Sequence, residues 1–209
     1  MKRIKDERTR IDGYPFSIGG AEFFNNRIYA EDYEWLQLAY LTDILSAEGW
    51  EAPEYAVKLE PPEADFQTYL DPSSTFRRVE VTQILRPVYR QKEFHRENAE
   101  SGIIYRDCPE PDPKPWSNFL HVLRRKLMKP YAPGAWLLIY HNMGSSDFED
   151  FTPWHKRVIG ELRKWTSETD STCDITQSRY QSIFVVNCSG TAAVRLYPHW
   201  DVVKEARFP

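Results

Sequence analysis

The chain has 209 residues and a formal net charge of −4, with 41% hydrophobic and 28% charged side chains. This balance excludes a disordered protein and predicts a globular chain with a sizeable core. No apolar run approaches the ~20 residues of a membrane span, and the first residues lack the apolar segment of a secretory signal. Three cysteines at unrelated spacings argue against a disulfide framework and a zinc site. We therefore expect a cytoplasmic protein with no membrane partner.

Glycine and proline interrupt residues 1–28, which predicts an irregular N-terminal arm that has room for one short strand or turn. A single domain is expected over residues 29–209. A helix is expected over residues 31–47, and Gly49 ends it. Its apolar positions recur at helical spacing: Trp35, Leu38, Leu41 and Leu45. Glu34 lies on the same stripe and has two interpretations. It can serve the helix dipole as a first-turn acid, or it can belong to a functional site.

Three short strands are expected next, over residues 54–59, 64–70 and 76–85, because apolar and polar side chains alternate in each. The turn residues Asp-Pro-Ser-Ser at 71–74 join the last two strands into a hairpin.

If those turn residues form the loop, Leu70 pairs with Thr75, and counting back places Asp65 opposite Glu80 on one face of the hairpin. Two neighbouring carboxylates repel each other, which a cation between them would relieve. The alternative is a solvent-facing surface on which acidic residues serve solubility.

The second half of the chain alternates helices and strands. Residues 86–115 form a charged, proline-rich excursion that we expect to border the site. The remaining predicted elements are a helix over 116–129, a buried strand over 135–140, a helix that starts at Thr152 and Pro153, and strands over 180–186 and 191–197. This order predicts an α/β fold, a single domain with a central mixed β-sheet flanked by helices.

The order of elements, with an acid at the end of one strand and another in the next, resembles the PD-(D/E)XK nuclease superfamily. The stretch ILSAEGWEAPEYAVKLEPPEADFQTYLDPSSTFRRVEVTQ looks like its core half-motifs, and FLHVLRRKLMKPYAPGAWLLIY is similar to the helix and strand that follow the site. The resemblance covers about residues 30–140 and implies a restriction-endonuclease-like core.

Carried over by position, the resemblance implies that Asp65 is the metal-binding Asp, Glu80 the Glu of the E-x-K motif, and Glu34 the helix Glu of many members. The chain departs from the motif where the family has lysine, because Thr82 stands there. Thr82 can donate a hydrogen bond but carries no charge. A lysine from elsewhere can fill the role, with Lys126 as first candidate because it follows Leu123 by three residues at the edge of its helix's apolar stripe.

Lys58 on the first strand is the second candidate. Phosphodiester cleavage independently favours a hard cation held by carboxylates, so we expect Mg²⁺ or Mn²⁺ on Asp65 and Glu80, with the Val81 carbonyl as a third ligand. Glu34, the helix Glu that the resemblance implies, is the remaining candidate metal ligand. Two functions stay open. The first is a Mg²⁺-dependent nuclease, with DNA favoured over RNA. The second is a catalytically inactive module of the same fold that binds nucleic acid or a protein partner.

Overall fold

A computed structural model describes residues 8–13, 27–84, 115–129, 133–141, 160, 179–187, 192–199 and 201–204. These residues form one eight-stranded sheet whose strands are adjacent in sequence order, β1 to β8. The strands are β1 (Thr9–Arg10), β2 (Tyr55–Lys58), β3 (Phe66–Tyr69), β4 (Thr75–Ile84), β5 (Ala135–His141), β6 (Tyr180–Asn187), β7 (Ala193–Tyr197) and β8 (Asp201–Lys204). The described helices are the 3-10 turn η1 (Ile11–Gly13), α2 (Arg27–Ala47) and α4 (Pro115–Leu127).

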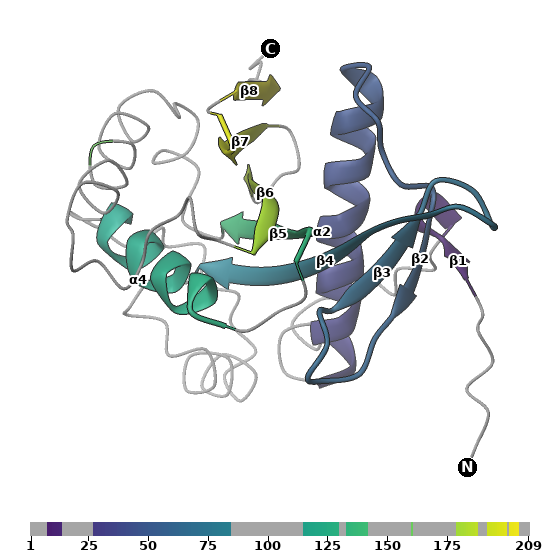
Figure 1. Ribbon diagram of the computed structural model, residues 1–209, viewed down its shortest axis with the longest axis horizontal. Coiled ribbons are helices and arrows are strands. Elements are labelled where there is room, and N and C mark those ends of the chain that lie inside the picture. The colour runs from purple at the N-terminus through teal and green to yellow at the C-terminus, as the bar shows by residue number, and fades with distance from the viewer. Residues whose placement is uncertain are drawn as a thin grey trace, which may run out of the picture.

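The sheet is mixed, as predicted. Strands β4, β5 and β6 run parallel, and every other neighbouring pair is antiparallel. Helix α4 lies between the parallel strands β4 and β5 along the chain, as is usual for a connection between parallel strands. Figure 1 shows β4 crossing in front of α2, with its C-terminal end pointing toward α4. None of the described helices combines the length and the apolar character needed to cross a membrane.

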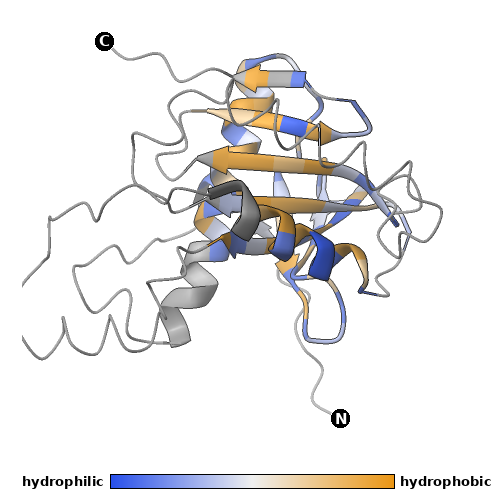
Figure 2. Cartoon of the chain, turned by 90° about the vertical axis from the view of Figure 1, so that its left-hand side faces the viewer, coloured by the Kyte–Doolittle hydropathy of each residue, from blue (hydrophilic) through white to orange (hydrophobic). Residues whose placement is uncertain are grey.

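Alternating side chains of the parallel strands supply two hydrophobic clusters. Val79, Val81 and Leu138 pack with Leu38 and Leu41 of α2 in one cluster. The other cluster contains Ile84, Leu137 and Ile139 with Phe119 and Leu123 of α4. Successive strand residues point to opposite faces, so α2 and α4 cover opposite faces of the sheet (Figure 1). Strand β5 is covered on both faces and is buried from Ala135 to Tyr140, as expected for an almost wholly apolar strand. Figure 2 shows several strands of the sheet mostly in the hydrophobic colour.

Helix α2 begins at Arg27, four residues before the predicted start at residue 31. Its predicted apolar stripe is confirmed, because Trp35, Leu38, Leu41 and Leu45 are all buried. The early start moves Glu34 out of the first turn, which contains no acidic residue. The interpretation of Glu34 as a first-turn acid that serves the helix dipole is therefore wrong.

The predicted pairing of Leu70 with Thr75 is also wrong, because Tyr69 pairs with Thr75 and a β-bulge follows. From Phe66 with Val79 onward, the strands follow the register that places Asp65 opposite Glu80. The tight turn explains the shift: the Asp71 carboxylate accepts hydrogen bonds from the amides and hydroxyls of Ser73 and Ser74. The bulge then compensates for the shift of one residue.

Several predictions lie outside the described residues. These are the 86–115 excursion except its final residue, nearly all of the helix that begins at Thr152, the three cysteines, and most of the N-terminal arm. The short strand considered for the arm is present as β1. Strand β8 was not predicted, and it extends the sheet beyond β7.

Candidate functional site

A cleft of about 820 Å³ opens beside the middle of β4, between the loop that precedes β3 and the C-terminal end of α4. Four carboxylates and three cationic groups line it, so it is strongly polar. The residues that line the cleft are Glu34, Pro61, Pro62, Glu63, Ala64, Asp65, Arg78, Glu80, Val81, Lys126, Lys129 and Ala135. The cleft therefore contains Glu34, Asp65, Glu80, Val81 and Lys126, the residues that the sequence proposed as ligands or as the replacement lysine.

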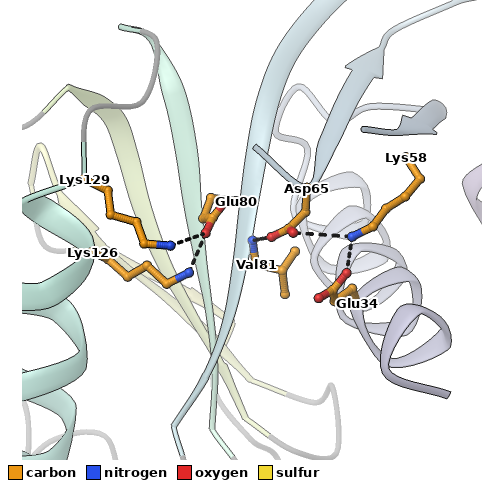
Figure 3. A network of polar contacts seen from close by, with 7 residues as sticks. All are labelled: Glu34, Lys58, Asp65, Glu80, Val81, Lys126 and Lys129. Atoms are coloured by element: carbon orange, nitrogen blue, oxygen red, sulfur yellow. Dashed lines mark hydrogen bonds and ion pairs between the residues drawn. The ribbon is translucent and has the colours of Figure 1, made fainter. Parts of the chain in front are cut away.

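Glu80 projects from β4 toward α4, where two lysines meet it (Figure 3). The Lys126 ammonium forms a buried ion pair with Glu80 Oε1, and the two side chains are 9% and 5% exposed. Lys129 Nζ lies 4.0 Å from the same oxygen, and the Lys129 side chain is 46% exposed. Lys126 faces the sheet because it lies three residues, nearly one turn, after the buried Leu123.

Asp65 lies on the other side of Val81 in Figure 3, at the end of the loop that leads into β3. Its Oδ2 accepts a hydrogen bond of 2.7 Å from the Val81 amide, and its backbone carbonyl accepts one of 2.9 Å from the Leu59 amide. These two bonds fix the carboxylate against the strand that carries Glu80. Asp65 and Glu80 therefore line the same cleft, although their side chains have different lysine partners.

Lys58 of β2 connects Asp65 to α2. Its ammonium forms an ion pair with Glu34, lies 3.4 Å from Asp65 Oδ1, and sits 4.5 Å from the centre of the Phe66 ring (Figure 3). Burial raises the pKa of the Glu34 carboxyl, and the negative charge of Asp65 raises it further. The Lys58 partner lowers the pKa of Glu34 but does not cancel these effects.

The donor chemistry of the cleft fits a hard divalent cation. Its potential ligands are carboxylate and carbonyl oxygens, and no cysteine or histidine is among its lining residues. Mg²⁺ typically uses one or two protein carboxylates and keeps several waters. Among the described residues, no three His, Cys, Asp or Glu side chains converge closely enough to form a metal-binding group. Binding would therefore use Asp65 and Glu80, and each would have to exchange a lysine contact for a metal contact.

Thr82 is buried, two residues beyond Glu80 on the same strand, and it is not among the residues that line the cleft. The structure places the ammonium of Lys126, rather than the Thr82 side chain, beside Glu80. Arg78, Glu63 and Lys129 line the cleft but were not proposed from the sequence. Lys129 could have been found, because it follows Lys126 by three residues.

Comparison of the chain with protein-family models, with curated proteins and with solved structures found no match. The functional argument therefore depends on the geometry of the cleft and on the order of the elements around it.

Proposed function

We propose that the protein is a Mg²⁺- or Mn²⁺-dependent nuclease with a restriction-endonuclease-like core, and that it hydrolyses phosphodiester bonds, with DNA favoured over RNA. The observation that carries the proposal is the lining of one cleft by Asp65, Glu80 and Lys126, two acids and a buried lysine from three separate elements. A buried ionisable cluster in a cleft is typical of a functional site, because burial of charge costs stability.

The order of elements supports the same proposal. Helix α2 precedes the antiparallel strands β2, β3 and β4, and α4 then leads to β5, which pairs with β4 in parallel. This order is the one on which the resemblance to the PD-(D/E)XK superfamily rests.

Asp65 and Glu80 would hold the metal ion, with the Val81 carbonyl as the third protein ligand. A bound divalent ion neutralises developing charge on the phosphate and lowers the pKa of a bound water. Lys126 would place its positive charge at the attacking water and the transition-state phosphate, the role that Thr82 cannot fill. Charge or proton assistance of this kind contributes roughly 10²–10⁴-fold to a rate. Glu34 and Lys58 would orient Asp65 from the α2 side.

A second candidate, a non-catalytic nucleic-acid-binding module, has one observation in its favour. Both acids have lysine partners, and the described residues contain no ready group of three metal ligands. A cleft that already neutralises its acids with lysines can serve binding without a metal ion. The two candidates differ in whether a divalent ion enters the cleft.

Cleavage of labelled single- and double-stranded DNA and RNA, in Mn²⁺ and in EDTA, tests the proposal. Wild type should cleave only with metal. Asp65→Asn and Glu80→Gln should abolish cleavage, and Lys126→Ala should slow it roughly 10²–10⁴-fold while metal binding persists. The exposed Glu48, in the turn directly after α2, supplies a matched control, Glu48→Gln, that should retain full activity. Wild type that leaves all four substrates intact, with folded structure verified, would favour the binding module.

A further inference from the structure

A second cleft, of about 400 Å³, adjoins the first at the starts of β4, β5 and β6. Two arginines, two glutamines and a threonine line it, and no acidic side chain is among its described lining residues. Those residues are Gln67, Thr75, Phe76, Arg77, Arg78, Pro133, Gly134, Ala135 and Gln181. The composition suits an anion, in contrast to the acid-rich cleft described above.

The β-bulge between β3 and β4 builds this cleft. The register shift between Gln67 and Tyr69 leaves Phe76 and Arg77 together opposite the single residue Thr68. The buried Thr68 hydroxyl donates to the Arg77 carbonyl at 2.7 Å and accepts from the Arg77 amide at 3.2 Å. Gln67 Nε2 donates to the same carbonyl at 3.2 Å. Side chains from β3 thus hold the bulge and the backbone of Arg77 in place.

The Arg77 side chain keeps an unused donor. One guanidinium nitrogen, Nη1, donates to the Phe76 carbonyl at 2.9 Å, and the guanidinium lies 4.9 Å from the centre of the Phe76 ring. Its Nε is buried and has no hydrogen-bond partner. A buried donor without a partner costs free energy, which a bound acceptor would recover. Arginine is also the cation best suited to recognise phosphate oxygens in a bidentate manner.

The two clefts are neighbours, because Arg78 and Ala135 line both. Arg78 also pairs with Glu63 at the rim of the first cleft. Along β4, the three residues from Arg77 to Glu80 span about 10 Å. A nucleic acid strand that presents one phosphate at Asp65 and Glu80 can therefore present a nearby phosphate to the arginines.

We propose that the cleft at Arg77 and Arg78 binds a backbone phosphate of the nucleic acid strand next to the phosphodiester that the site cleaves. The inference rests on the proposed function and identifies the substrate as a polynucleotide held at a second phosphate. A mononucleotide or free phosphate shares the anionic chemistry but cannot span the two clefts.

The test measures binding of a fluorescein-labelled single-stranded oligonucleotide by anisotropy, in EDTA, as a function of salt. Arg77→Gln should weaken binding about ten- to a hundredfold, as expected for loss of a charge-assisted hydrogen bond. The magnitude of the slope of log affinity against log salt should fall by about one, which corresponds to the loss of one phosphate contact. Arg77→Lys should restore part of the salt slope but less of the affinity, because lysine lacks the bidentate geometry. The exposed Arg125 of α4 supplies the matched control, Arg125→Gln, which should bind like wild type.

Arg78→Gln is measured in the same way, because Arg78 takes no part in the hydrogen bonds that hold the bulge. The inference therefore remains testable if Arg77→Gln fails to fold. Unchanged affinity and salt slope in folded Arg77→Gln and Arg78→Gln would overturn the inference, as would wild type that does not bind the oligonucleotide. Inorganic phosphate that stabilises wild type but not Arg77→Gln, while oligonucleotide affinity is unchanged, would assign the cleft to free phosphate and also overturn it. Arg77-dependent oligonucleotide binding without any Mn²⁺-dependent cleavage would support the phosphate-binding role of this cleft while the proposed nuclease activity fails.

Discussion

Removal of either member of the Glu80–Lys126 pair should destabilise the protein, and the two losses should be unequal. Both side chains are at least nine-tenths buried. Breaking such a pair costs about 3–5 kcal/mol, because it leaves one charge without compensation in a poorly solvated place. That is a large fraction of the roughly 5–15 kcal/mol that separates native from unfolded states.

The asymmetry follows from Lys129, whose Nζ lies 4.0 Å from Glu80 Oε1. In Lys126→Met, Glu80 keeps this second cation, which lowers the loss by up to about 1 kcal/mol because Lys129 is solvent-exposed. In Glu80→Leu, Lys126 loses the acid that faces it, so the full penalty is expected. The double variant Glu80→Leu with Lys126→Met should unfold within about 1 kcal/mol of wild type, because no unpaired charge remains.

Urea unfolding followed by circular dichroism measures the free energies of unfolding of wild type, the two single variants and the double variant, which form a double-mutant cycle. The double variant also separates stability from function, because it should regain stability but not metal-dependent cleavage. Losses below about 1 kcal/mol in both single variants would refute the reasoning, since that is the range of solvated surface pairs.

Four further predictions concern single side chains. Because the pKa of Glu34 is raised in the folded protein, its contribution to stability is present below about pH 4.5 and is lost as pH rises through the folded pKa. Unfolding free energies measured at several pH values should show this loss in wild type and a flatter pH dependence in Glu34→Gln. Lys58→Met should raise the pKa of Glu34 further, and a lower pKa in a carboxyl ¹³C NMR titration would contradict the assigned partner. Gln37→Met should increase the free energy of unfolding by about 1–3 kcal/mol, because both polar atoms of the buried Gln37 amide lack partners, and a loss of stability would contradict this. Thr82→Lys in the wild-type background should leave the cleavage rate unchanged, and in the Lys126→Ala background it should partly restore the rate. Cleavage by the single variant Thr82→Lys that is faster than that of wild type would indicate that Lys126 does not replace the missing lysine.

Alternating or continuous apolar runs predicted strands β2 to β7, and apolar residues at helical spacing predicted α2 and α4, whereas β8 was not predicted. Lys126 could be placed near the sheet for the same reason, since its spacing from Leu123 is that of a helix face. The sequence pattern is informative wherever one residue type repeats at the period of the element that contains it.

The bulge at Phe76 and Arg77 could not be predicted in this way. It depends on the Thr68 hydroxyl taking over the hydrogen bonds of the Arg77 backbone, and a threonine in a strand carries no signal of such a role. The partners of Glu34 were hidden for a related reason. They come from β2 and from the loop before β3, and only the folded register brings Lys58 and Asp65 to α2.

A crystal soaked in Mn²⁺, measured at the manganese absorption edge, tests most directly whether Asp65 and Glu80 hold a metal ion. The account predicts an anomalous peak between the two carboxylates, about 2.0–2.3 Å from an oxygen of each, with Lys126 moved away from Glu80. The peak should disappear in Asp65→Asn. A cleft without a peak, in which Lys58 and Lys126 keep their contacts with the acids at saturating Mn²⁺, would contradict the metal-dependent nuclease.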